Sequence, residues 1–176
     1  LKRGFPNEVN VSYPTLKSLD SIIVAGLQDS AFPGATFLAA KDGIIFHEKG
    51  FGKLSYKQDS PKVTKGTIYD LASLTKVLST TSAAMKLYEQ GKLKLDTPVY
   101  KVLPEFGKHG KKQVTFRHLL THTSGLPDWA PLWKRGETSE KMVDAICEMK
   151  PVYETGTKSV YSCMGFIILG KVIKKI

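Results

Sequence analysis

Two residues with complementary chemistry, Ser73 and Lys76, lie three positions apart in the segment LASLTKVLSTTSAAMKL, residues 71–87. The apolar residues of this segment recur with a helical period, and side chains three positions apart share one face of a helix. A serine hydroxyl is a poor nucleophile until a base removes its proton. A lysine in apolar surroundings loses its charge more easily, so we expect the pKa of Lys76 to be lowered. The spacing therefore favours a serine nucleophile with a lysine base.

The position of Lys76 near a helix start supports the same interpretation. A cation there opposes the helix dipole, and no acidic residue lies three or four positions away to pair with it. A nucleophile at the same place gains, because the dipole and the free backbone N–H groups favour negative charge on the attacked carbonyl oxygen. The alternative is that Lys76 extends to solvent from an ordinary helix, since Ser-x-x-Lys also occurs by chance.

Four segments extend this pattern over most of residues 32–173. They read FPGATFLAAKDGIIFHEKGFG, TIYDLASLTKVLSTTSAAMKLYEQGKLKLDTPVYKVLPEF, VTFRHLLTHTSGLPD and YETGTKSVYSCMGFIILGKVI. In content and order they resemble the serine β-lactamase and penicillin-binding protein superfamily, in particular its class C β-lactamase-like branch, which includes esterases and D-aminopeptidases. The resemblance implies an α/β (α+β) fold in which an antiparallel sheet flanked by helices joins a mainly helical region.

The segment Tyr161-Ser162-Cys163 stands where the superfamily has a Tyr-x-Asn motif. The resemblance implies that Tyr161 shares a proton with Ser73 and Lys76, and a nearby ammonium would lower the tyrosine pKa enough for such a shuttle. The alternative is that Tyr161 is a half-buried core aromatic. Cys163 replaces an amide that binds the lysine and the substrate, and a thiol is a weak donor and acceptor. We expect Cys163 to touch substrate and to impair β-lactam turnover more than acyl transfer itself.

The third motif of the superfamily, a Lys/His-Thr/Ser-Gly strand, is expected a long interval after the tyrosine. Thirteen residues follow Cys163 and none of them match, while the HTSG at residues 122–125 precedes Tyr161 and belongs to another block. We therefore expect an N-terminal portion, truncated before the C-terminal strands. The missing part would carry one of two oxyanion-hole N–H groups, so these residues alone should show little hydrolysis.

The resemblance also implies the class of reaction and where it takes place. Ser73 would form an acyl-enzyme with a β-lactam, peptide or ester carbonyl, the substrate being a small molecule or a peptidoglycan-like polymer, and no cofactor is implied. Members of the superfamily usually act outside the cytoplasm, in the periplasm, at the cell surface or as secreted proteins. No targeting segment is visible in these residues.

The net charge of +10 favours contact with anionic surfaces such as a membrane surface or the cell wall. The basic residues are dispersed in short groups such as KHGKK and KVIKK, and no aromatic RNA-binding signature accompanies them, so we expect no nucleic-acid partner. A different interpretation of the charge is a non-catalytic basic module that binds peptidoglycan or another anionic envelope polymer. The replacement at Cys163 and the absent third motif favour that alternative.

The histidines His118 and His122 are four positions apart and could hold a metal on one helix face. No glutamate lies between them and no third ligand is evident, so we expect no metal site and assign the pair to helix-end and loop packing. Gly125 and Gly156 are expected to set turns, and Cys147 to lie in the core.

These candidate residues need helices and a short sheet to hold them. Residues 15–27 carry a helical period, and residues 35–52 form two strands joined by a tight turn at Asp42-Gly43. The patterns further predict a helix from Ser73 to Gly91, then an extended crossing, then a short helix stopped at Gly125, and helices from residues 139 and 161 onward.

We expect one incomplete domain over residues 1–176. Residues 1–60 would form the N-terminal helix and hairpin of the α/β part, and residues 61–176 the mainly helical part that carries both motifs. A two-stranded hairpin is marginal alone, so its open edge predicts self-association or pairing with a companion chain.

Overall fold

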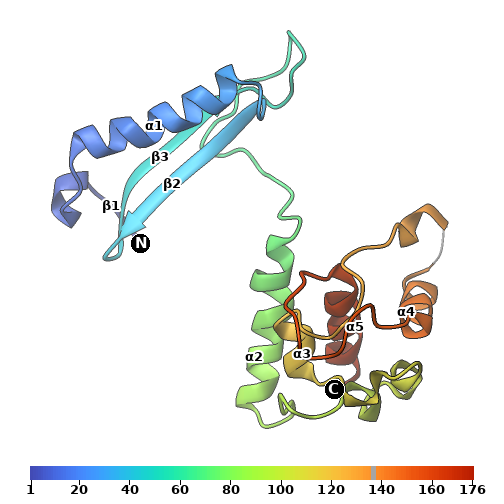
Figure 1. The fold of residues 1–176 in the computed structure, drawn as a ribbon. Helices are drawn as coiled ribbons and strands as arrows, with labels where there is room; N and C mark the ends of the chain where they lie inside the picture. Colours follow the sequence, from blue (N-terminus) through green and yellow to red (C-terminus); the bar gives the residue numbers. More distant parts are fainter. Residues whose placement is uncertain (136–137) are drawn as a thin grey trace. The chain divides into compact units, whose positions relative to one another are not determined.

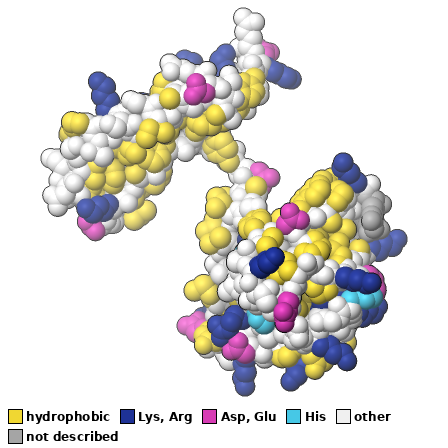
Figure 2. All heavy atoms as spheres, in the orientation of Figure 1, with side chains coloured by type: hydrophobic (Ala, Val, Ile, Leu, Met, Phe, Trp, Pro, Cys, Tyr) yellow, Lys and Arg dark blue, Asp and Glu magenta, His cyan; other side chains and the backbone are white. Residues whose placement is uncertain are grey.

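The computed structural model describes residues 1–135 and 138–176, which form two compact units, Leu1–Asp70 and Leu71–Ile176 (Figure 1). Lys and Arg side chains are spread over the drawn face of each unit rather than gathered in one patch (Figure 2). Within the described residues, none of the helices has both the length and the apolar character needed to cross a membrane.

The first unit is a helix packed along a three-stranded sheet with the strand order β1-β3-β2 (Figure 1). Its helix begins after Ser12, whose hydroxyl accepts a hydrogen bond from the Thr15 N–H at 3.2 Å and so caps the first turn. The elements are β1 Lys2–Arg3, a 3₁₀ turn Pro6–Val9, α1 Tyr13–Gln28, β2 Gly34–Lys41 and β3 Ile44–Gly52.

The hairpin predicted from the sequence is confirmed. Asp42 and Gly43 have φ angles of 51° and 78°, the pair of positive values that a tight two-residue hairpin turn requires. The sheet is mixed rather than wholly antiparallel, because β1 pairs with β3 in parallel, with Lys2 opposite Ile44. A strand of two residues is too short to show an alternating pattern, so the sequence did not predict β1. β2 has a single neighbour and is an edge strand of this sheet.

The loop after β3 remains part of the first unit. Lys53 and Lys62 form an isolated bridge, and the Val63 N–H donates to the Gly52 carbonyl at 3.0 Å. The Val63 side chain is buried, and the Thr36 hydroxyl donates to the Thr64 carbonyl. The division between the units therefore falls after Asp70 and not at residue 60.

The second unit is helical. Its elements are a π-helical segment Lys76–Thr81, α2 Ser82–Glu89, α3 Phe116–Leu120, α4 Ser139–Glu148 and α5 Cys163–Lys175, with 3₁₀ turns at Val99–Lys101, Pro104–Gly107, Lys111–Gln113 and Leu132–Arg135. The connection expected to be an extended crossing is in part coiled into the first two of these 3₁₀ turns. Gly91 has a φ of 70° beyond the end of α2, as the predicted glycine stop requires.

Two predicted helices differ from the observed ones. The helix expected from Ser73 is interrupted by the π-helical segment, and α3 ends at Leu120 rather than at Gly125. The chain turns earlier because His122 adopts a φ of 58°, which a continuing helix excludes. Gly125, with a φ of 85°, sets a later turn where its backbone passes close to Tyr153.

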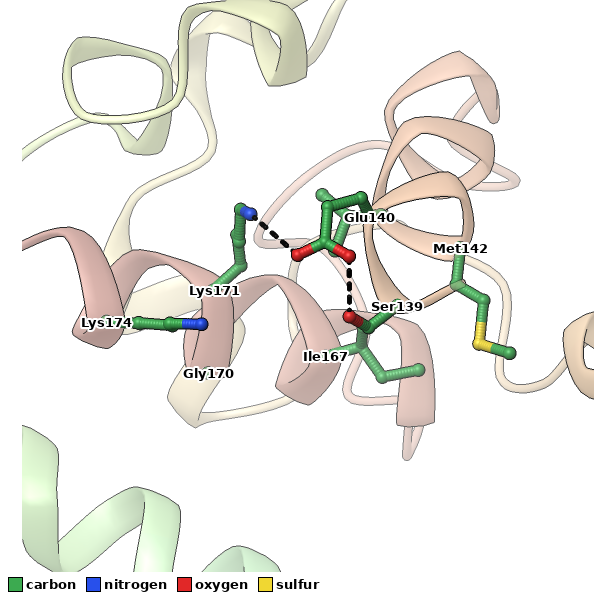
Figure 3. A pocket seen from close by; sticks show the side chains of 8 residues that line it. Ser139, Glu140, Met142, Ile167, Gly170, Lys171 and Lys174 are labelled. Atoms are coloured by element: carbon green, nitrogen blue, oxygen red, sulfur yellow. Dashed lines mark hydrogen bonds and ion pairs between the residues drawn. The ribbon is translucent and has the colours of Figure 1, made fainter. Parts of the chain in front are cut away.

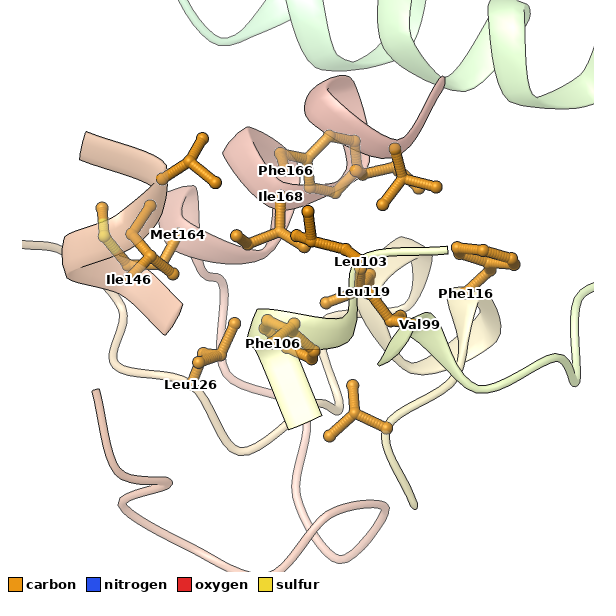
Figure 4. Packing of buried hydrophobic residues seen from close by; sticks show 14 of the residues in the cluster. Val99, Leu103, Phe106, Phe116, Leu119, Leu126, Ile146, Met164, Phe166 and Ile168 are labelled. Carbon is orange, nitrogen blue, oxygen red and sulfur yellow. The ribbon is translucent and has the colours of Figure 1, made fainter. Parts of the chain in front are cut away.

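An apolar cluster holds the second unit together, contributed by α2, α3, α4, α5 and the 3₁₀ turns (Figure 4). Cys147 is buried in it, as predicted. The fully buried side chains of the cluster include Val99, Leu103, Phe106, Phe116, Leu119, Leu126, Ile146, Met164, Ile168 and Leu169. This cluster fixes α5 against α3 and holds α2 through Ala84, and the residues that lead into α2 and α5 carry the candidate site.

Candidate active site

Ser73 lies in a tight turn at the start of the second unit. The Leu74 N–H donates to the Leu71 carbonyl at 2.8 Å, and the Lys76 N–H donates to the Ser73 carbonyl at 3.0 Å. Ala72, directly before Ser73, has a φ of 43°, a left-handed conformation that costs a non-glycine residue of order 1–3 kcal/mol. Strain of this kind gathers at functional sites, and it marks this turn as a candidate.

The turn places the Lys76 ammonium beside the Ser73 hydroxyl. The Lys76 Nζ donates a hydrogen bond to the Ser73 Oγ at 3.3 Å, the contact expected for residues three positions apart on a helical face. Ser73 is exposed and Lys76 is partly buried. The serine hydroxyl is therefore reachable by an incoming carbonyl group while it remains in contact with a charged neighbour.

The pKa of Lys76 is raised rather than lowered, so the expectation drawn from the sequence is wrong. Burial lowers this pKa, but the interactions with the Tyr161 and Cys163 side chains raise it by more. The apolar neighbours do not form a pocket around the ammonium, since the Leu74 and Leu78 side chains are 58% and 61% exposed. Lys76 therefore keeps its proton in this arrangement and acts on its neighbours as a positive charge.

The positive charge of Lys76 makes the Tyr161 phenol easier to deprotonate. Its pKa is lowered, first by the side-chain interaction with Lys76 and then by that with Ser73. The Lys76 Nζ lies 5.1 Å from the centre of the Tyr161 ring, and half of the Tyr161 surface is exposed. Ser73, Lys76 and Tyr161 are thus brought together within the second unit, and the phenol is the group of the three best prepared to give up its proton.

Ser162 anchors the segment that carries Tyr161 and Cys163. It is almost wholly buried, donates through Oγ to the Pro127 carbonyl at 2.6 Å, and accepts from the Gly165 N–H at 3.2 Å as the N-cap of α5. Its backbone is extended, so the side chains on either side of it point the opposite way. The anchoring of Ser162 therefore directs both Tyr161 and Cys163 toward Lys76, whose pKa both of them affect.

His122 is the residue of this site whose part the sequence did not show. Its Nδ1 accepts from the Ser162 N–H at 3.0 Å, and its ring lies 4.6 Å from the Tyr161 ring and 5.0 Å from that of Phe166. Loop packing was expected for His122 and is confirmed. The contact with Tyr161 joins positions far apart in the chain, so local sequence patterns do not predict it. The one signal in the sequence that points to His122 is its position in the HTSG segment.

His118 has the helix-end role that was expected. Its Nδ1 accepts from the Thr115 N–H at 3.2 Å and its own N–H donates to the Thr115 hydroxyl, which closes a capping box at the start of α3. Across residues 1–135 and 138–176, no three His, Cys, Asp or Glu side chains are grouped so that they could hold a metal ion.

A separate hollow of about 270 Å³ lies between α4 and α5 (Figure 3). Glu140 spans it, accepting from the Ser139 hydroxyl at 2.9 Å and lying 3.8 Å from the Lys171 ammonium. The polar side chains of this hollow therefore interact in part with one another. Ser73, Lys76 and Tyr161 do not line this hollow, so it is distinct from the candidate active site.

This chain is similar to known proteins over most of its own length. The N-acetylmuramyl-L-alanine amidase of Bacillus subtilis (strain 168) is 31% identical over 92% of this chain and 41% of its own. An octameric penicillin-binding protein homologue from Pyrococcus abyssi is 32% identical with a TM-score of 0.75, over 91% of this chain and 39% of its own. A class C beta-lactamase structure is 27% identical with a TM-score of 0.77, over 93% and 45%. The chain thus spans less than half the length of these relatives.

The family assignment rests on nearly the whole chain. The model of the beta-lactamase family matches residues 19–176, a range that includes the hairpin, the Ser73 turn and the Tyr161 segment. The solved structures share the fold of the described residues, which is β-lactamase-like. This chain therefore belongs to the beta-lactamase family, a family of serine hydrolases that includes penicillin-binding proteins.

Proposed function

We propose that Ser73 is the nucleophile of a serine acyl-transfer hydrolase and that Lys76 and Tyr161 move its proton. The observation that carries the proposal is the convergence of these three side chains, in which the ammonium contacts the serine hydroxyl at 3.3 Å and lowers the pKa of the phenol. A serine next to a group that can remove its proton, with a third group stabilising that base, is the arrangement that nucleophilic catalysis requires.

The directions of the two pKa shifts divide the roles. Lys76 remains an ammonium and stabilises the Tyr161 phenolate, which takes the proton from the Ser73 hydroxyl as that oxygen attacks the carbonyl carbon. The C–O bond to Ser73 forms, negative charge moves to the carbonyl oxygen, and the Ser73 N–H donates to that oxygen as half of an oxyanion hole. The carbonyl then re-forms as the bond from its carbon to the leaving group breaks, and the proton on Tyr161 passes to that leaving group. Water attacks the acyl carbon and breaks its bond to the Ser73 oxygen by the same path, which returns the proton to Ser73.

The proposed substrates are β-lactam, peptide or ester carbonyls, and among natural ones the peptide bonds of a peptidoglycan-like polymer. Support comes from the amidase and the penicillin-binding protein homologue that the chain resembles. We place the reaction outside the cytoplasm on the same grounds, with no cofactor. The octameric state of the homologue also favours self-association, for which the β2 edge is one candidate surface.

Cys163 is proposed to face the substrate beside Lys76. A thiol hydrogen-bonds weakly, so it holds an acyl-amide group less well than an amide side chain would. Replacing Cys163 by Asn should therefore raise β-lactam reactivity, or at least leave it unchanged. A loss of reactivity would mean that the thiol itself is needed.

The test is covalent labelling of the full-length protein with a fluorophosphonate and with a fluorescent penicillin, followed by intact-mass analysis and peptide mapping. The label should be found on Ser73, be absent from Ser73→Ala, and persist in Ser79→Ala, an exposed serine further along the same helical segment. Lys76→Ala and Tyr161→Phe should each slow labelling by about 10²-fold or more. The matched controls Lys86→Ala and Tyr88→Phe, on α2, should label at the normal rate.

A basic module that only binds an envelope polymer is the alternative that this experiment separates. It is favoured by Cys163 and by the net charge of +10. Such a module would retain peptidoglycan in a salt-dependent manner after Ser73→Ala and would show no Ser73-specific labelling. Labelling that survives Ser73→Ala would refute the nucleophile assignment.

A further inference from the structure

His122 holds the Tyr161 segment by three separate contacts, one through its backbone and two through its imidazole. Its backbone carbonyl accepts from the Val160 N–H at 2.9 Å, its Nδ1 accepts from the Ser162 N–H at 3.0 Å, and its ring lies 4.6 Å from that of Tyr161. Two of the contacts fix the backbone on either side of Tyr161, and the third supports the phenol ring itself. Phe166 packs at 5.0 Å from the imidazole and completes the stack from α5.

The contact with Ser162 defines where the imidazole carries its proton. A backbone N–H is a donor only, so the Nδ1 atom that accepts from it has no proton, and the neutral ring carries its proton on Nε2. Protonating Nδ1 would place two donors face to face. The contact is therefore compatible with the neutral imidazole alone.

We propose that His122 is a positioning residue for the reaction at Ser73: its neutral imidazole holds Tyr161 beside Ser73 and Lys76, and its protonation at acidic pH releases Tyr161 and slows acylation. The inference rests on the proposed function, because it adds to that reaction an acid limit set by a residue that touches neither substrate nor Ser73. It makes His122 a proton-sensitive support of the base.

The surroundings of His122 keep it neutral near pH 7. Burial lowers its pKa, and the positive charge of Lys76 lowers it further. Among the described residues, the Tyr161 ring stacks on the imidazole, the Tyr153 hydroxyl donates to the His122 backbone carbonyl at 3.3 Å, and α5 contributes the apolar Phe166. Because the folded pKa lies below the ordinary 6.5, the folded state loses stability as pH falls from 6.5 through that lower value.

The experiment is the pH dependence of Ser73 labelling in the full-length protein, compared between His122→Asn and the matched control His118→Asn. Asparagine tolerates the φ of 58° at position 122 and offers an amide oxygen near the place of Nδ1, but it does not titrate. Wild-type labelling should fall by about tenfold per pH unit as the Tyr161 phenolate is lost, and by about a hundredfold per pH unit below the His122 pKa, where both groups take up protons. His122→Asn should label about tenfold more slowly at pH 7.5, since the ring contact is lost, and should keep only the tenfold-per-unit fall due to Tyr161. His118→Asn should keep the wild-type profile.

A second measurement on the wild-type protein is independent of activity. Long-range ¹⁵N–¹H spectra at pH 7.5 should show the His122 proton on Nε2 and an unprotonated Nδ1. A proton on Nδ1, or an acid fall in His122→Asn as steep as in the wild type while Ser73→Ala abolishes labelling, would overturn this inference and leave the proposed function intact. Absence of Ser73 labelling in the wild type would overturn both.

Discussion

Replacing Ser162 by Ala should destabilise the second unit by about 2–4 kcal/mol. Two losses combine at this one buried hydroxyl. Removal of the N-cap bond from the Gly165 N–H costs about 1 kcal/mol, and the Pro127 carbonyl, left without its 2.6 Å donor, costs about 1–3 kcal/mol. The methyl side chain itself fits, since alanine is smaller than serine and the extended backbone at this position suits it.

The assay is urea unfolding followed by tryptophan fluorescence. Both tryptophans of the chain, Trp129 and Trp133, lie in the second unit, with ring centres 5.1 Å apart, so the signal reports on that unit. Ser139→Ala serves as the control, because that serine is exposed and bonds only to its neighbour Glu140 among the contacts seen. If the two variants differ by less than about 0.5 kcal/mol, Ser162 is no anchor and its role in aiming Tyr161 must be abandoned.

Two further outcomes follow from backbone conformation and thiol burial. Gly125→Ala should cost more than the roughly 1–2 kcal/mol of a left-handed alanine, because the new Cβ would lie 2.5 Å from the Tyr153 carbonyl oxygen. Gly91 has a φ of 70° and open space around it, so Gly91→Ala measures the cost of the left-handed conformation alone in the same urea assay. If the two variants lose equal amounts of unfolding free energy, the clash at Tyr153 is contradicted. Burial raises the pKa of the Cys147 thiol to about 11, so iodoacetamide at pH 8 should label the partly exposed Cys163 at least ~10²-fold faster. Comparable labelling rates, measured by peptide mass, would contradict this.

The features that sequence reasoning predicted well are those written in local spacing. The Asp42-Gly43 turn needs two positive φ angles and has the residues that allow them, and the Ser73–Lys76 contact follows from helical spacing alone. The capping role of His118 is equally local, since its partner Thr115 is three positions away.

The features that sequence reasoning missed depend on tertiary context. The pKa of Lys76 was expected to be lowered because apolar residues flank it, but periodicity does not say whether a helical face is covered, and this one is exposed. His122 meets Tyr161 only after the loop following α3 has folded against the start of α5. Lys2 and Arg3 form a strand only because β3 offers a free edge to them.

The π-helical segment Lys76–Thr81 places a wide turn between Ser73 and the core. A π-helical turn closes i to i+5, one residue more than an α-helical turn, so it takes up one more residue for the same rotation. Deleting one residue from the segment would let that turn close as an α-helical one and would leave Ser73 facing nearly the same way relative to Ala84, the buried residue by which α2 meets the core. Deleting Ala83, in the regular α2, would instead rotate Ser73 by about 100° relative to Ala84. The direction of the nucleophile therefore tolerates the loss of a residue within the wide turn but not the loss of one in α2.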